Sequence, residues 1–164
     1  MRQLFLIRHA KSSWALPGVR DFDRPLNDRG IHDAPLMAAL LRDAGVRPNL
    51  IVSSPAKRAI TTARFFANGL GIADAAIVQE PNIYEAFFTD IMEIIHALPD
   101  SAPTVLMFGH NPTFTDVANR FSSELIFNVP TCGIVRIESS AAEWSSFSAE
   151  NARVTSSYFP KESL

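Results

Sequence analysis

The chain has 164 residues, of which 47% are hydrophobic and 20% charged, and its formal net charge is −2. This composition is typical of one globular domain and excludes disordered and fibrous proteins. The small negative charge argues against a broad nucleic-acid-binding face and against a polybasic membrane anchor. Cys132 is the only cysteine, so neither an intrachain disulfide nor a cysteine-based metal site is expected.

No apolar run approaches the ~20 residues that span a bilayer, and residues 4–7 are too short for the apolar core of a signal peptide. We find no internal repeat and no linker that divides the chain. The sequence therefore predicts a cytoplasmic protein with a single domain over residues 1–164, whose tail after about residue 150 is loosely ordered. Neither nucleic acid nor a membrane is expected as a partner.

Short apolar runs mark the expected strands. They occupy residues 4–7, 50–52, 75–78, 104–108 and 133–138, and a last edge strand is expected at residues 143–149. The first three runs also fit pieces of buried helix. Their shortness and the turn residues that follow each of them favour strands.

Segments with helical periodicity separate these runs. They occupy residues 27–45, 55–70, 89–98 and 112–121. Pro35 lies inside the first segment and predicts a kink or a late helix start there. Because strands alternate with helices, the sequence predicts an α/β fold, a three-layer α/β/α sandwich with a mostly parallel central sheet.

Two arginines and two histidines follow the expected strands. Arg8 and His9 come after the first strand, Arg58 lies one helical turn beyond the second, and His110 follows the fourth. Ligands of open α/β sheets bind beyond the carboxyl ends of the strands, so we expect these four side chains to converge on one pocket. Side chains of a strand alternate between its faces, and the first strand must therefore end near Ile7 for both of its neighbours to serve that pocket.

The starts of two expected helices suit the same kind of ligand. Ser54-Pro55 and Asn111-Pro112 each predict an N-cap followed by proline at the first helical position. A helix N-terminus offers unpaired N–H groups and the positive end of the helix dipole, and both favour anions.

These groups predict a pocket for a phosphate dianion. The guanidinium groups of Arg8 and Arg58 match phosphate oxygens, and His110 would donate another hydrogen bond. The sequence has no Walker loop, no aspartate pair after a strand and no HExxH motif, so we expect the arginines to take the place of a metal and no cofactor to be needed. His9 is the expected nucleophile, because nearby arginines disfavour imidazolium and a neutral imidazole can pass a phosphoryl group to water.

A poor leaving group would also require a general acid. Glu85 is the candidate, because it follows the third apolar run and would reach the same edge of the sheet. Glu80 is the alternative.

Four sequence elements resemble the signature motifs of the histidine phosphatase superfamily, which has the phosphoglycerate mutase-like fold. They are LFLIRHAK, RPLNDRG, VSSPAKRAITTA and FGHNP, and they run from residue 4 to 112 in the order and spacing of the family. The short chain, RHAKSSW, DFDRPLN and IYEA are most similar to the SixA-type phosphohistidine phosphatases. Ala10 replaces the glycine of the first motif, and the register of Glu85 relative to the family's glutamate is ambiguous.

The resemblance implies a phosphohistidine intermediate at His9, with Arg8, Arg58 and His110 around the phosphate. It also implies that Arg24 contacts phosphate or substrate, although Arg24 could equally be a surface charge paired with Asp21 or Asp23. In larger relatives an insertion caps the site, and this chain has little room for one. The implied substrate is therefore phosphohistidine on a partner protein. Two alternatives stay open, a phosphatase of a small phosphate ester and a phosphate-binding module without catalysis.

Overall fold

The computed structural model describes residues 1–164, which form one six-stranded sheet with the order β3-β2-β4-β1-β5-β6. The strands are β1 (Arg2–Arg8), β2 (Leu50–Ser53), β3 (Val78–Gln79), β4 (Thr104–Gly109), β5 (Ile134–Ser139) and β6 (Ala152–Tyr158). The first four are parallel, and β5 pairs antiparallel with both β1 and β6. The prediction of a mostly parallel sheet is confirmed.

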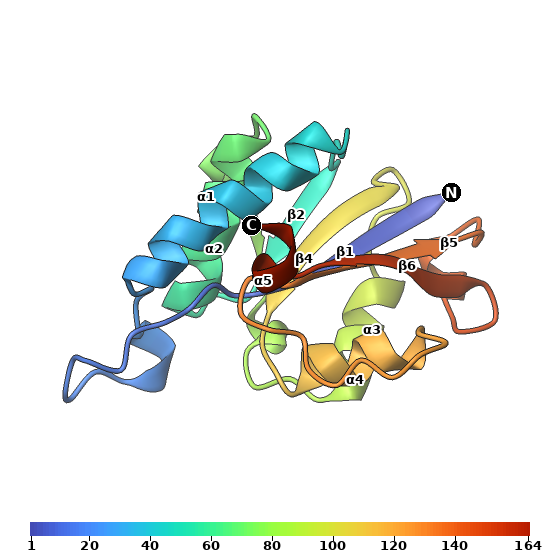
Figure 1. Cartoon of the computed structure of the whole chain (residues 1–164). Helices are drawn as coiled ribbons and strands as arrows, with labels where there is room; N and C mark the ends of the chain where they lie inside the picture. Colours follow the sequence, from blue (N-terminus) through green and yellow to red (C-terminus); the bar gives the residue numbers. More distant parts are fainter.

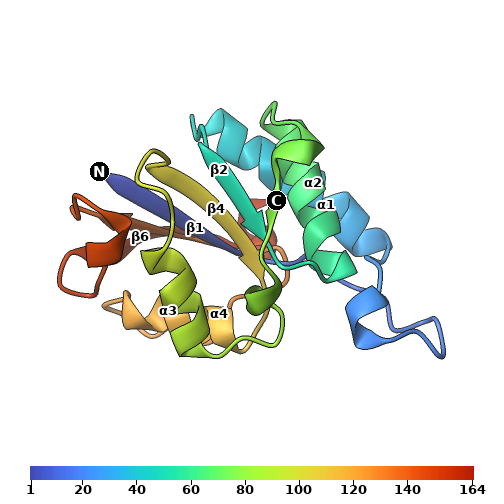
Figure 2. The same ribbon diagram turned by 180° about the vertical axis from the view of Figure 1, so that it is seen from behind.

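Helices cover both faces of this sheet. They are α1 (Asp28–Asp43), α2 (Lys57–Gly69), α3 (Phe88–His96), α4 (Thr113–Arg120) and a short C-terminal α5 (Pro160–Ser163). Helices α1 and α2 lie on one face, and α3 and α4 lie on the other (Figures 1 and 2). The predicted α/β/α layers are therefore present. None of the helices combines the length with the apolar composition of a membrane span.

The apolar residues of β1 alternate between the two layers. Leu4 and Leu6 pack in one buried cluster with side chains of α3 and α4. Phe5 and Ile7 pack in the other, with side chains of α1 and α2. Side chains of successive strand residues point to opposite faces, so a continuous apolar run is what a strand buried on both sides requires.

Gly30 fixes the start of α1 against the segment that follows β1. A Cβ atom at this position would lie 2.3 Å from the carbonyl oxygen of Lys11, so only glycine permits the contact. Asn27 caps the helix, because its side chain accepts a hydrogen bond from the Gly30 N–H at 3.0 Å. Its own N–H donates to the same Lys11 oxygen at 3.0 Å. The RPLNDRG element thus anchors the chain directly after His9.

Two local expectations about the N-terminal half are corrected by the structure. Helix α1 begins at Asp28 and continues through Pro35, so the late start, one of the two outcomes expected there, is wrong. Pro35 and Ile31 are both exposed, so the carbonyl left without an N–H partner lies on the solvent side of the helix. The run at 75–78 forms the 3₁₀ turn η2 (Asp74–Ala76) and the two-residue strand β3 rather than one longer strand.

The C-terminal expectations also differ from the structure. Residues 143–149 were expected to form an edge strand, but they contain the 3₁₀ turn η4 (Trp144–Ser146), whose indole is fully buried and donates to Ala102 O at 2.9 Å. The edge strand is β6, so the tail after Glu150 is not loosely ordered. Half-buried residues alternate with exposed ones along β6, which is the pattern of an edge strand with one covered face.

Candidate active site

The register between β1 and β4 places the two histidines side by side. Arg8 pairs with Gly109, and the His9 N–H donates to the Gly109 carbonyl at 3.0 Å. The imidazole rings of His9 and His110 have centroids 5.4 Å apart and are tilted by 50°. Strand β1 ends at Arg8, and there the Cys132 N–H donates to the carbonyl oxygens of Arg8 and His9, both at 3.0 Å. The neighbouring order of β4 and β1 thus brings together groups that are about a hundred residues apart in sequence.

His9 has a defined tautomer. Its Nδ1 atom lies 2.7 Å from the carbonyl oxygen of Ala10. A carbonyl oxygen only accepts hydrogen bonds, so Nδ1 carries the proton and Nε2 carries the free lone pair. The Ala10 N–H donates to Thr62 Oγ1 at 3.0 Å, and the same hydroxyl donates to the Arg58 carbonyl at 2.7 Å. Thr62 therefore joins the segment after His9 to α2.

Both histidines of the pair are neutral at pH 7. The pKa of His9 is lowered to about 3, chiefly by burial and then by electrostatic repulsion from His110, Arg58 and Arg8, against the hydrogen bond to Ala10, which raises it. The pKa of His110 is lowered to about 4, chiefly by burial and then by the charge of Arg58. The sequence predicted a neutral His9 but gave the arginines as the cause, whereas burial is the larger cause.

We expect this pair to make the protein less stable in acid. Between about pH 4 and 6.5 the unfolded chain protonates His9 and His110, whereas the folded chain does not. The free energy of unfolding should therefore fall as the pH decreases below 6.5, with a slope of up to about 1.4 kcal/mol per pH unit for each histidine. Denaturant titrations across this range measure the slope. An unchanged slope in a His9→Gln/His110→Gln double variant would contradict the assignment.

Arg58 occupies the first turn of α2, where its side chain is buried and held by one loop residue. Nη1 donates to the Asp21 carbonyl at 2.7 Å and Nη2 to the Asp21 carboxylate at 3.0 Å. Arg8 is half-buried, and its Nη1 donates to Val129 O at 3.1 Å. Burial lowers the pKa of Arg8, and the nearby charge of Arg58 lowers it further. The two guanidinium groups therefore repel each other, which favours a bound anion between them.

Buried nitrogen atoms without partners gather in this cluster. Five buried side-chain nitrogen or oxygen atoms of the chain have no hydrogen-bond partner, and three of them are Nε of Arg8, Nε of Arg58 and Nδ1 of His110. Buried polar atoms are almost always paired in native structures. Three unpaired nitrogens around one histidine lone pair are what a tetrahedral oxyanion would satisfy.

Asp21 was missed by the sequence analysis except as a surface partner of Arg24. Its carboxylate accepts from Arg58, from the Tyr84 hydroxyl at 2.7 Å and from Arg24 Nε at 3.2 Å. Burial acts to raise the pKa of Asp21, but hydrogen bonds from Tyr84 and Arg58 lower it to about 2. Burial and the bond to Asp21 raise the pKa of Tyr84 to about 12. This network ties the loop before α1 to α2 and to the segment after β3.

Arg24 is a buried member of that network rather than a free surface charge. It is 8% exposed and pairs with Asp21, one of the two partners considered from the sequence. Its Nη1 donates to Ser12 Oγ at 2.9 Å, and its guanidinium lies 3.5 Å from the centroid of a Trp14 ring. The DFDR sequence was the available signal, since an aspartate three residues before an arginine suits a local ion pair.

The predicted N-caps are shifted in the structure. Helix α2 begins at Lys57, and Ser54 Oγ accepts instead from the Ala56 N–H at 3.2 Å while contacting His110 Nε2 at 2.8 Å. Helix α4 begins at Thr113. Asn111 still serves that helix start, because its Oδ1 accepts from the Thr115 N–H at 3.2 Å. Ser54 therefore contacts the candidate site instead of capping α2, whereas Asn111 supports the first turn of α4.

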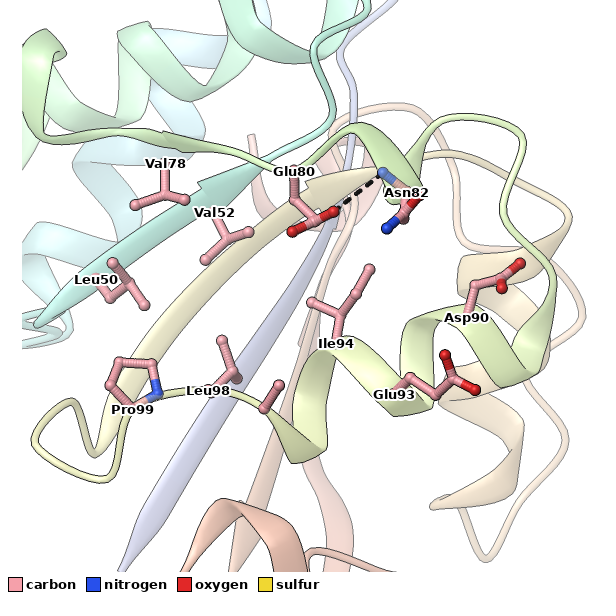
Figure 3. A pocket seen from close by; sticks show the side chains of 11 residues that line it. Leu50, Val52, Val78, Glu80, Asn82, Asp90, Glu93, Ile94, Leu98 and Pro99 are labelled. Atoms are coloured by element: carbon pink, nitrogen blue, oxygen red, sulfur yellow. Dashed lines mark hydrogen bonds between the residues drawn. The ribbon is translucent and has the colours of Figure 1, made fainter.

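The two candidate acids line different cavities. Glu85 is exposed, has a φ of 57° and lines a cavity of about 300 Å³ together with His110. Glu80 lines another cavity, of about 540 Å³, between β2, β3 and α3 (Figure 3). Its Oε1 atom accepts from the Asn82 N–H at 3.1 Å. Of these two cavities, only the one lined by Glu85 also includes a member of the cluster, His110.

Comparisons with known proteins agree with this geometry. A family model described as histidine phosphatase superfamily (branch 1) matches residues 4–125. A chloroplast protein of Arabidopsis thaliana is 32% identical over 152 residues, which are 87% of this chain and 69% of that protein.

Solved structures give the same result. An Agrobacterium tumefaciens protein assigned as a SixA phosphohistidine phosphatase has a TM-score of 0.82 at 31% identity, over 97% of this chain and 98% of that one. The protein histidine phosphatase SixA, complexed with tungstate, has a TM-score of 0.82 at 20% identity, over 98% of both chains. With two histidines and two arginines already in place at the sheet edge, these matches show that the chain belongs to branch 1 of the histidine phosphatase superfamily, of the SixA type, and is a phosphohydrolase.

Proposed function

We propose that this protein is a metal-independent phosphatase that forms a phosphohistidine intermediate on His9 and removes phosphate from phosphohistidine on a partner protein. The observation that carries the proposal is the set of unpaired nitrogens of Arg8, Arg58 and His110 beside the neutral imidazole of His9. Arginine donors stabilise the charge on transferring phosphoryl oxygens, which is the main requirement of this chemistry.

The reaction would proceed in two displacements. The lone pair on His9 Nε2 attacks phosphorus, forming a P–N bond while the bond to the leaving group breaks. Arg8, Arg58 and His110 donate hydrogen bonds to the phosphoryl oxygens during the transfer. Water then attacks the phosphohistidine, releases phosphate and returns the lone pair to Nε2.

Glu85 and Arg24 have supporting roles in this proposal. Glu85 is the general acid for the leaving group, supported by the cavity it shares with His110. Arg24 is a further substrate contact. Its Nε and Nη1 atoms donate to Asp21, Ser12 and Ser13, whereas Nη2 makes no such hydrogen bond and could donate to substrate. A phosphohistidine leaving group needs less acid assistance than an alcohol, since its P–N bond is labile.

Exposed apolar side chains near the cluster support a protein substrate over a small phosphate ester. Trp14 and Phe87 are 76% and 77% exposed, and Phe127 is 92% exposed. Trp14 stacks on Arg24 in the segment that projects from the body between β1 and α1 (Figure 1). Phe87 lies two residues after Glu85. Phe127 lies two residues before Val129, whose carbonyl oxygen accepts a hydrogen bond from Arg8. Large exposed apolar groups beside a polar pocket are typical of a macromolecular contact surface.

These three exposed side chains, called the rim here, predict that mutation lowers activity on one class of substrate more than on another. Phe87→Ala and Phe127→Ala should each lower kcat/KM by about tenfold for a phosphotransfer domain phosphorylated on histidine. Neither should change kcat/KM for p-nitrophenyl phosphate by more than about twofold, because the small substrate does not reach the rim. Leu36→Ala on α1 is the control, since Leu36 is also exposed but lies on a helix away from the cluster. Equal losses on both substrates would favour the small-ester reading.

Removal of metal tests the reaction type. Phosphate release from phosphohistidine should be the same in buffer and in excess EDTA, with a metal-dependent phosphatase as the control for chelation. Activity that is lost in EDTA and restored by a divalent cation would contradict the proposal. Tight phosphate binding without turnover in the native protein would identify a binding module instead.

A further inference from the structure

The hydrogen bonds of His110 differ from those of His9. His110 Nε2 lies 2.8 Å from the hydroxyl oxygen of Ser54, and its Nδ1 is buried without a partner. A hydroxyl can donate or accept, so this contact alone leaves the tautomer of the imidazole open. The environment of Ser54 decides it.

The Ser54 hydroxyl is fully buried on the turn between β2 and α2. Its oxygen accepts the Ala56 N–H at 3.2 Å. The hydroxyl proton then needs an acceptor of its own, and His110 Nε2 is the acceptor within hydrogen-bond distance. If His110 instead donated from Nε2, the serine proton would be buried without a partner, which native structures avoid.

We propose that Ser54 donates to Nε2 of His110 and so holds this ring in the Nδ1–H tautomer, which makes Ser54 a positioning residue for phosphoryl transfer. The proposal rests on the phosphatase function proposed above. It explains how two neutral imidazoles serve opposite roles. His9 donates its Nδ1–H to Ala10 and presents a lone pair to phosphorus. His110 accepts at Nε2 and presents an N–H to a phosphoryl oxygen.

The tautomer matters because His110 does not gain a second proton near neutral pH. Its pKa is lowered to about 4, chiefly by burial and then by Arg58 of α2, with smaller lowering by Arg8 of β1 and by Arg24 against the raising effect of Asp21. The other groups facing the ring are the imidazole of His9 and the phenol of Tyr84, with centroids 5.4 and 5.6 Å away. A neutral ring has one N–H, so only the Nδ1–H tautomer can donate from its unpaired nitrogen.

The tautomer can be read in the unmodified protein. Long-range ¹H–¹⁵N spectra of the native chain should show His110 with a protonated, pyrrole-type Nδ1 and a pyridine-type Nε2. The reverse pattern would overturn the proposal. This measurement needs no substrate and no variant, so it is independent of whether the protein hydrolyses phosphohistidine.

Matched serine variants test the consequence for the reaction. Ser54→Ala should lower kcat for p-nitrophenyl phosphate by about 10- to 100-fold near pH 7, with a smaller change in KM. Ser53→Ala is the control, because Ser53 is equally buried but its hydroxyl donates to the Ser54 carbonyl at 2.9 Å and does not contact His110. It should keep nearly the native kcat.

The pH profile separates positioning from a loss of structure. As the pH falls towards about 4, protonated His110 carries a proton on both nitrogens, so the deficit of Ser54→Ala relative to the native protein should shrink. A deficit that stays constant with pH, or an unaltered kcat, would overturn the proposal. If Ser54→Ala does not fold, the tautomer spectrum of the native chain decides. Absence of any phosphatase activity in a native protein with the expected spectrum would instead refute the proposed function.

Discussion

Replacement of His9 by alanine is expected to lower kcat for phosphohistidine hydrolysis by at least about 10⁴-fold, because it removes the proposed nucleophile. His9 is 7% exposed at the end of β1, and its Nε2 carries the free lone pair of the cluster. Steady-state phosphate release measures the loss. His9→Gln should lose as much, since it keeps most of the volume but not the nucleophile.

His32→Ala is the matched control for this experiment. His32 lies on the exposed side of α1 and has only Asp33 as a partner, so its removal should leave kcat unchanged. Retention of more than about a hundredth of the native kcat in His9→Ala would contradict a covalent role for this residue, because removal of a nucleophile costs far more.

Arg58→Ala is expected to lower kcat/KM by about 10²- to 10³-fold, the cost of removing one group that stabilises a developing oxyanion. The guanidinium is buried, its Nε is unpaired and its charge acts on both histidines. The variant should also bind inorganic phosphate at least about tenfold more weakly by calorimetry, since a charge-assisted donor is lost. Arg58→Lys should recover part of the activity, because an ammonium restores the charge but not the paired donors.

Arg64→Ala serves as the control for Arg58. Arg64 is an exposed residue of the same helix, so its loss should change neither kcat/KM nor phosphate affinity. Loss of phosphate affinity in Arg64→Ala, or native affinity in Arg58→Ala, would contradict the position given to the anion.

The sequence predicted the layers of the fold because its apolar runs are short and strongly patterned. Residues 4–7 and 105–108 are continuous apolar runs, which a strand buried on both faces requires. The order that makes β4 a direct neighbour of β1 depends on long-range packing and follows from no local pattern. The convergence of His9 and His110 was nevertheless predicted, because both follow strand ends and these meet at one edge of the sheet, and the motif resemblance agreed with it.

Predictions failed where tertiary contacts outweigh local preference. Residues 143–149 contain two residues that favour strands, Trp144 and Phe147, but Trp144 is buried in the core and its indole donates to Ala102. The polar sequence of β6 gives a weak strand signal, yet pairing with β5 orders it. Local propensity is a weak guide at such positions.

Sequence reasoning likewise predicted only part of the candidate site. A position after a strand end could be predicted for Arg8, His9 and His110, since strand ends meet at one edge. The full role of Asp21 could not, because only its pairing with Arg24 is local, whereas Arg58 and Tyr84 reach it from distant segments of the folded chain. The hydrogen bond from Ser54 to His110 joins residues 56 positions apart and likewise has no sequence signal.

Trapping the covalent intermediate tests the central claim most directly. After a rapid quench of the native protein with a ³²P-labelled phosphohistidine substrate, the label should be acid-labile and alkali-stable and should lie on the peptide that contains His9. The same quench of His9→Gln should leave no label on the enzyme. Label on any other residue, or turnover of the native protein without a labelled enzyme, would contradict phosphoryl transfer through His9.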